Sequence, residues 1–135
     1  MILDTSVLVT AERRNQTVGQ IFAQFRTAFG EIEAGLSVVT VVELTHGLHR
    51  AKLDEQRHRR KVFLDDLLTD LSIYPVTTNI AKLAGRISGQ EAEHGVSLPF
   101  EDLLIGATAL DLGWPVVTHN VRHFQMIPNL AIAQL

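Results

Sequence analysis

Short apolar runs alternate along the chain with longer segments in which apolar residues recur every three to four positions. The short runs, which are typical of buried strands in a parallel sheet, are Met1–Leu3, Leu36–Val39, Ile73–Val76, Val116–Val117 and Leu130–Ala133. Helical spacing is found between them, over residues 7–11, 18–32, 43–51, 62–71, 78–87 and 103–111. Strands that alternate with helices predict an α/β fold whose parallel sheet is covered on both faces.

The stretch Pro99–Phe124 has the clearest local signals. Pro99 suits the first turn of a helix, where its missing N–H costs nothing. Gly113 stands where a glycine commonly ends a helix, and the strand Val116–Val117 follows. Polar residues 118–120 come directly after that strand. The stretch therefore predicts a loop, a helix, a tight turn, a strand and a second loop.

Other local signals set boundaries elsewhere. Gly35 is expected to end the helix over residues 18–32. The segment Thr40–Glu43 has the sequence of a capping box, which predicts that a helix begins there. Pro75 lacks a backbone N–H, so the third strand is expected at an edge of the sheet.

Composition narrows the class of protein. A chain of 135 residues with 46% hydrophobic residues predicts a single domain over residues 1–135. It has no cysteine, which excludes thiolate metal sites and fits a reducing compartment. No apolar run reaches the roughly 18 residues of a membrane span, and the first residues lack the basic region of a signal peptide. We therefore expect a cytoplasmic protein with no membrane partner.

The charge distribution limits how nucleic acid could be bound. A net charge of −3 argues against affinity from bulk charge, so phosphate binding would need a local basic patch or metal ions. Residues Arg50–Lys61 hold six of the twelve Lys and Arg residues. Such a stretch is most often a solvated helix face, and it could also contact phosphates or a partner.

Three acids fall at junctions between a strand and a helix. Asp4 ends the first strand, Glu43 opens the helix after the second, and Asp102 opens the helix before the fourth. Parallel sheets form their sites at the carboxyl edge of the strands. Carboxylates that converge there repel one another unless a cation neutralises them, and oxygen ligands favour Mg²⁺ or Mn²⁺. Such a cation suits the attack of water on a phosphodiester.

These acids also have a structural interpretation. Glu43 occupies the third position of the capping box, and Asp102 would interact favourably with a helix dipole. Asp4 has less of a structural role, because it follows an apolar strand directly. Among the six histidines, His46 and His49 lie three residues apart, but nothing completes a zinc set.

Four stretches of the chain resemble the PIN-domain ribonucleases, and most of all the VapC toxins of bacterial toxin–antitoxin modules. They are MILDTSVLV, SVVTVVEL, LPFEDLLIGATAL and GWPVVTHNVRHF, in the order that the family keeps. The resemblance implies a three-layer α/β/α sandwich with a central parallel sheet of about five strands. It also implies Mg²⁺-dependent cleavage of RNA, with Mn²⁺ able to substitute, a homodimer, and neutralisation by a cognate VapB-like antitoxin.

The resemblance also assigns residues. It makes Asp4, Glu43 and Asp102 the metal-binding acids. The other site residues that we expect are Thr118 and Asn120 in catalysis, and Thr5, Ser6, Arg13, Arg14, Arg50 and Arg122 in substrate binding. The family often has a fourth acid in the loop that here carries Asn120 and His123. We therefore expect one firmly bound ion, with a second arriving only with the substrate phosphate.

The expected reaction is hydrolysis that leaves a 5′-phosphate. Since water attacks, the 2′-OH of RNA takes no part, and the choice of RNA over DNA must come from binding. Two alternatives remain at this point. One is an inactive or housekeeping PIN domain. The other is a receiver-like Mg²⁺-binding signalling module, which lacks its expected Asp after residues 73–76 and its Lys after Val116–Val117.

Overall fold

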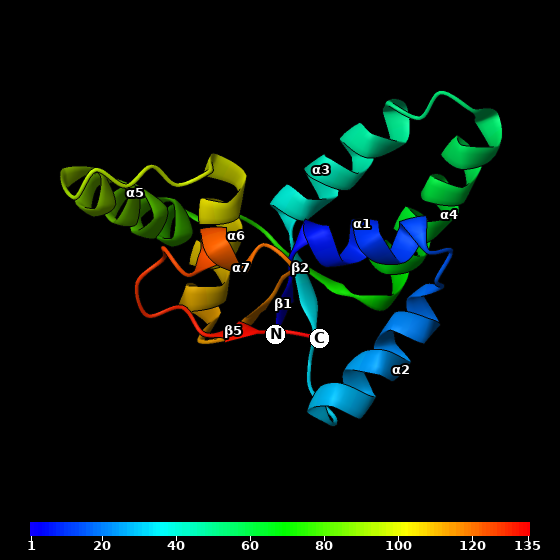
Figure 1. Ribbon diagram of the computed structural model, residues 1–135, viewed down its shortest axis with the longest axis horizontal. Coiled ribbons are helices and arrows are strands. Elements are labelled where there is room, and N and C mark those ends of the chain that lie inside the picture. The colour runs from blue at the N-terminus through cyan, green and yellow to red at the C-terminus, as the bar shows by residue number, and fades with distance from the viewer.

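Five short strands pair in parallel at the centre of the molecule (Figure 1). In the computed structural model, which describes residues 1–135, they are β1 (Ile2–Leu3), β2 (Gly35–Ser37), β3 (Ser72–Tyr74), β4 (Val116–Val117) and β5 (Ile132–Ala133). Their order in the sheet is β3-β2-β1-β4-β5, and every neighbouring pair is parallel. The parallel sheet and the edge position of β3 are as the sequence predicts.

Seven helices surround the sheet. They are α1 (Thr5–Arg13), α2 (Val18–Phe29), α3 (Val38–His49), α4 (Asp54–Asp70), α5 (Thr78–Glu93), α6 (Phe100–Leu112) and α7 (Val121–Phe124). None of them is both long enough and apolar enough to cross a membrane.

Alternate residues of the central strands point to opposite faces and create two cores. Leu3 and Val117 join the side chains of α1, α2 and α4 in one buried cluster. Ile2 and Val116 join those of α5, α6 and α7 in the other. All four strand residues are fully buried, as expected for a parallel sheet covered on both sides. The result is a three-layer α/β/α sandwich, with α5, α6 and α7 on one side and α1, α2 and α4 on the other (Figure 1).

The order of the strands reverses between β1 and β4. The chain adds β2 and β3 on one side of β1, and then β4 and β5 on the other. Connections therefore leave in opposite directions at this point, which opens a crevice at the carboxyl ends of the two strands. The N–H of Asp4 donates to the carbonyl of Val117 at 2.9 Å, so Asp4 and Thr118 leave the sheet side by side.

Helices α3 and α4 form a hairpin that projects away from the sheet (Figure 1). Glu12 of α1 is only 7% exposed and joins α1 to the hairpin through its carboxylate. Its Oε1 accepts a hydrogen bond from Arg59 Nε at 3.0 Å, while Arg60 Nη1 donates to the carbonyl of Gly47 at 2.6 Å. These bonds connect α1, α3 and α4 beside the edge where the acids lie.

Two helix boundaries that rested on local signals differ from the expectation, and α4 begins at Asp54, well before the helical spacing over residues 62–71. Helix α2 ends at Phe29, because Gly30 takes the positive φ of 78° that its exit requires. Gly35, expected to end this helix, lies instead in β2. Helix α3 begins after Ser37, whose side chain accepts the N–H of Val39 at 3.2 Å. The capping box predicted at Thr40–Glu43 is therefore wrong, and both residues lie inside the helix.

The stretch from Pro99 follows the prediction more closely. Helix α6 begins directly after Pro99 and ends at Gly113, which is left-handed with φ 69°. The segment expected as a loop after β4 contains α7 instead, a helix of four residues. Such a helix is too short to show a period in its sequence.

We expect Gly35→Ala to destabilise the fold. A Cβ at this position would lie 2.5 Å from Cε2 of Tyr74 and 3.0 Å from the backbone oxygen of Ser72, so the neighbouring strand must shift. Overpacking of this kind costs about 1–3 kcal/mol. Gly85→Ala is the matched control, because Gly85 lies in α5 with nothing within 4 Å of its Cβ position. It should gain up to about 1 kcal/mol of helix stability. Urea unfolding measures both, and equal stability of Gly35→Ala and the wild type would contradict the packing at β2.

Candidate metal centre

Asp4 is buried at the carboxyl end of β1, with 2% of its surface exposed. It is the residue before α1, but its side chain makes no capping hydrogen bond. Instead its Oδ2 accepts hydrogen bonds from Ser6 Oγ at 2.6 Å and from Thr118 Oγ1 at 2.7 Å. Two donors on one oxygen hold the carboxylate in place and leave Oδ1 without a protein partner.

The two hydroxyl groups on Asp4 are themselves fixed by the loop after β4. Ser6 Oγ accepts the N–H of His119 at 3.1 Å, and Thr118 Oγ1 accepts the N–H of Asn120 at 2.8 Å. Each hydroxyl has one proton, which it donates to Asp4, while its oxygen accepts a backbone N–H. The backbone N–H groups of His119 and Asn120 thus orient two hydroxyl groups, and these hydroxyl groups hold the carboxylate of Asp4.

Glu43 approaches from α3. Its Oε1 accepts a hydrogen bond from Thr5 Oγ1 at 2.8 Å, and Thr40 Oγ1 lies 3.1 Å from the same hydroxyl. Burial raises the pKa of Glu43 above its ordinary value. The hydrogen bond from Thr5 acts in the opposite direction, and the negative charges of Asp4 and Asp102 raise the pKa further. Glu43 is therefore close enough to both acids to interact with their charges.

Asp102 approaches from the first turn of α6. Its Oδ2 lies 2.7 Å from Nδ1 of His123 in α7. Burial raises the pKa of Asp102, the hydrogen bond from His123 opposes this, and the charge of Asp4 raises it again. The side chain thus has the same arrangement as the other two acids, with one oxygen bonded to a protein donor.

The three acids fit a hard divalent cation. Each has one carboxylate oxygen bonded to the protein and the other without a protein partner. No three acidic or imidazole side chains already form a set at metal-ligand distance. Mg²⁺ keeps several of its waters and takes only one or two carboxylates directly, so a looser arrangement of oxygen donors suits it. All three donors are oxygens, which disfavours zinc.

The basic residues expected at the substrate are spread over different surfaces. Arg13 lines a cavity of about 170 Å³ together with Glu43, between α1, α3 and α4. Arg14 lines a different cavity together with His119. Arg122 is exposed in α7. Arg50 lies beyond the last turn of α3, seven residues after Glu43, which is about 10 Å of helix.

Three polar contacts at the site were not expected from the sequence. His123 bonds Asp102, Thr40 lies against Thr5, and Thr10 Oγ1 lies 3.2 Å from Nδ1 of His119. The spacing gives a signal for Thr10, which lies one helical turn after Ser6 and so shares its face. No such signal exists for Thr40 or His123, since their partners come from other elements.

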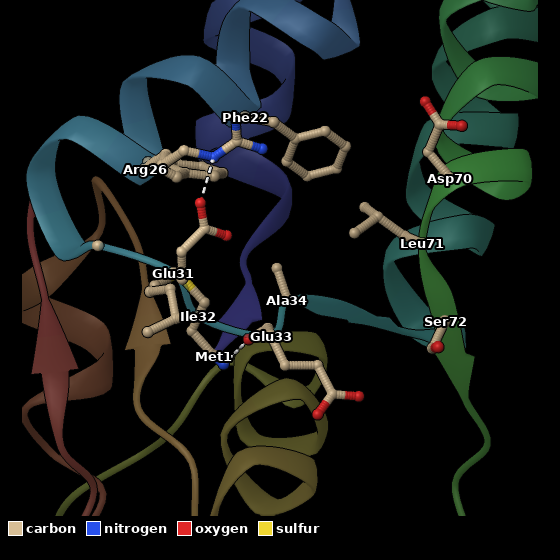
Figure 2. A pocket seen from close by; sticks show the side chains of 12 residues that line it. Met1, Phe22, Arg26, Glu31, Ile32, Glu33, Ala34, Asp70, Leu71 and Ser72 are labelled. Atoms are coloured by element: carbon tan, nitrogen blue, oxygen red, sulfur yellow. Dashed lines mark hydrogen bonds and ion pairs between the residues drawn. The ribbon is translucent and has the colours of Figure 1, made fainter.

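A separate hollow of about 330 Å³ lies at the opposite end of the strands, between α2, β2 and β3 (Figure 2). Glu31 pairs with Arg26 of α2 at 3.1 Å, and both side chains are largely exposed. Asp70 stands on the α4 side, apart from Glu31 and Glu33 (Figure 2). An exposed ion pair and scattered acids do not form a catalytic set, so the hollow is not a competing site.

Two known ribonucleases are similar to this chain over nearly its whole length. Ribonuclease VapC of Rickettsia bellii is 25% identical over 132 residues, which cover 98% of this chain and 93% of the relative. Ribonuclease VapC19 of Mycobacterium tuberculosis is 28% identical over 129 residues, which cover 96% of this chain and 95% of the relative.

The fold is also similar to that of a solved structure. The solved structure of VapBC2 from Rickettsia felis, bound to a DNA fragment from its promoter, superposes with a TM-score of 0.83 at 22% identity. The match covers 98% of this chain and 96% of that chain. The sequence model of the PIN domain matches residues 1–129. This match spans nearly the whole sequence, and the chain belongs to the PIN domain family.

Proposed function

We propose that this protein is a Mg²⁺-dependent endoribonuclease and the toxin of a VapBC-type toxin–antitoxin system. The observation that carries the proposal is the set of three acids at the strand-order reversal, each with one oxygen available to a cation. The relatives named VapC, which match over almost their whole length, support RNA as the substrate class.

Asp4 and Asp102 would hold the ion, with Glu43 completing its shell or orienting the attacking water. A bound divalent cation supplies a more acidic water and neutralises charge that develops on the phosphate. Ser6 and Thr118 hold Asp4 through Oδ2, so that Oδ1 is presented to the ion. In the reaction the water oxygen bonds to phosphorus, the bond from phosphorus to the 3′ oxygen breaks, and that oxygen leaves with a proton.

Glu43 is also suited to accept the proton that the attacking water loses. Its raised pKa makes the carboxylate a stronger base than an exposed glutamate would be. Thr5 donates to Oε1 and leaves Oε2 for the water. Asn120, exposed beside Thr118, would hold a water of the ion or the substrate through its amide.

The substrate contacts follow from the positions of the basic residues. Arg13, Arg14 and Arg122 would contact phosphates near the scissile bond, and Arg50 one that lies farther along the strand. Thr5 and Ser6 would act mainly through the acids that they bond. We expect single-stranded or loop RNA, where such contacts are usual.

The biological setting that we propose is that of the VapBC relatives. A cognate VapB-like antitoxin would neutralise the enzyme, the protein would be a homodimer, and its RNA substrate would place it in the cytoplasm. Membership of the PIN domain family disfavours the receiver-like alternative. The relatives named ribonuclease disfavour an inactive or housekeeping domain.

The first test is of activity. With Mg²⁺ or Mn²⁺ the protein should cut single-stranded RNA, and EDTA should stop it. Asp4→Asn and Asp102→Asn should each lower the rate by about 100-fold or more, because each removes a charge that holds the ion. Asp66→Asn, an exposed substitution in α4, should have no effect. Undiminished cleavage by both site variants would refute the assignment of the metal centre.

Glu43→Gln should stabilise the metal-free protein in a pH-dependent way. The pKa of Glu43 in the folded protein is raised above its ordinary value, so ionisation of Glu43 lowers the free energy of unfolding. This loss of stability grows as the pH rises from the ordinary pKa through the raised one. Glutamine stays neutral and keeps an acceptor for Thr5. In EDTA the melting temperature of the variant should exceed that of the wild type near neutral pH, and the difference between them should vanish at about pH 4. Thermal melts measure this.

The same experiment has two internal checks. Added Mg²⁺ should stabilise the wild type more than Glu43→Gln, because binding stabilises only the protein that holds the ion. Asp66→Asn should show no comparable gap. A Glu43→Gln variant that melts below the wild type in EDTA at every pH would mean that the charge of Glu43 is favourable in the fold.

An added acid in the loop after β4 should strengthen ion binding. His123→Asp would place a carboxylate beside Asp102, and Asn120→Asp would place one beside Thr118. Each should tighten Mg²⁺ binding by about tenfold, because affinity rises with the charge of the ligands. His94→Asp, exposed after α5, adds the same charge elsewhere and should not. Calorimetric titration with Mg²⁺ decides this, and unchanged affinity in both loop variants would place that loop outside the site.

A further inference from the structure

The ring of His119 is held at the edge of the candidate metal centre. The backbone N–H of His119 donates to Ser6 Oγ at 3.1 Å, and that oxygen lies 2.6 Å from Oδ2 of Asp4. His119 is thus two hydrogen bonds away from a carboxylate that we assign to the ion. The residue is nevertheless exposed, so a ligand can reach its ring.

The contacts of Thr10 favour one position for the proton on the neutral ring of His119. Thr10 Oγ1 donates its one proton to the carbonyl of Ser6 at 2.8 Å. The same oxygen lies 3.2 Å from Nδ1 of His119, and with its proton directed to Ser6 it accepts from the ring. This arrangement favours the tautomer of the neutral ring that carries its proton on Nδ1 and presents Nε2 as an acceptor. No protein group bonds to Nε2, so this acceptor is available to a ligand.

A cavity of about 360 Å³ lies beside this ring, between α1 and α2. Its polar lining includes Arg14, Gln16 and Gln24 in addition to Thr10 and His119. The volume is typical of small-ligand pockets. A guanidinium suits a phosphate, and amide groups suit the donors and acceptors on the edge of a base. The chemistry of the lining therefore fits a nucleotide.

We propose that this cavity is a nucleotide subsite, in which Nε2 of His119 accepts a hydrogen bond from the ribose 2′-OH next to the scissile phosphate. The inference rests on the proposed ribonuclease function. Water is the nucleophile in that reaction, so the selection of RNA over DNA has to come from binding. A fixed acceptor for the 2′-OH provides this selection, because DNA leaves it unpaired. His119 is the specificity-determining residue, and Thr10 is the positioning residue that fixes its tautomer.

The test measures binding to the Asp102→Asn protein, in which cleavage should be slow enough for binding to be measured. Three short single strands of one base sequence are compared in Mg²⁺: RNA, RNA with 2′-fluoro riboses, and DNA. The fluoro sugar keeps the shape of a ribose but has no hydroxyl proton to donate. RNA should bind about tenfold more tightly than either of the others, which corresponds to about 1.4 kcal/mol.

Two variants locate the source of this preference. His119→Phe keeps a ring without its nitrogens, and Thr10→Val removes the oxygen that fixes the tautomer. In both, RNA should bind as weakly as the fluoro strand, and the affinity for DNA should not change. His94→Phe, exposed on the far side of the sheet, is the control and should keep the preference. Thermal melts establish that each variant is folded.

The outcomes separate this inference from the proposed function. A wild type that cleaves RNA in Mg²⁺, while Asp102→Asn binds RNA and fluoro RNA equally, overturns the role of His119 and leaves the nuclease in place. RNA fragments that end in 2′,3′-cyclic phosphate would also overturn it, since the 2′-OH would then be the nucleophile. A wild type that cleaves no RNA, but whose preference for RNA disappears in His119→Phe, would support the subsite and refute the nuclease.

Discussion

Three acids at one edge of the sheet are buried or partly buried, and the repulsion among their negative charges is the constraint on which the site depends. Burial raises the pKa of Glu43 and of Asp102, and the charge of Asp4 raises both further. The protein offsets this cost with hydroxyl and imidazole donors, but each acid receives them on one oxygen only. In the function that we propose, the remaining oxygens bind a cation, whose positive charge would offset the repulsion among the three acids.

The topology explains why these acids meet. Strands β1 and β4 are neighbours although more than a hundred residues separate them, and the reversal of strand order falls between them. Asp4 ends one of these strands and Thr118 follows the other. Helices α3 and α6 contact each other, and they bring Glu43 and Asp102 to this edge of the sheet. Asp4 follows β1 directly, and both residues of that strand are fully buried.

The sequence predicts the parts of this arrangement that depend on neighbours along the chain. The alternation of elements, the helix after Pro99 and the role of Gly113 all follow from local signals. Glu43 lies near Asp4 and Asp102, but the local signal proposed for it is wrong, because Ser37 and not Thr40 caps the helix that carries it. The bond between His123 and Asp102 could not be foreseen, since it depends on the packing of α7 against α6. Sequence patterns report local geometry, and contacts between distant elements need the fold.

Ser6 connects Asp4 with His119, the residue that we propose to select the substrate. Its single proton is directed to Asp4, and its lone pairs receive the N–H of His119. Its backbone carbonyl takes the proton of Thr10, which leaves the Thr10 oxygen free to accept from the His119 ring. The orientation of the Asp4 carboxylate and the contacts of the His119 ring therefore both depend on one residue in the first turn of α1. A rearrangement of this turn would disturb both together, whereas changes at Thr10 or His119 leave the two hydrogen bonds to Asp4 in place.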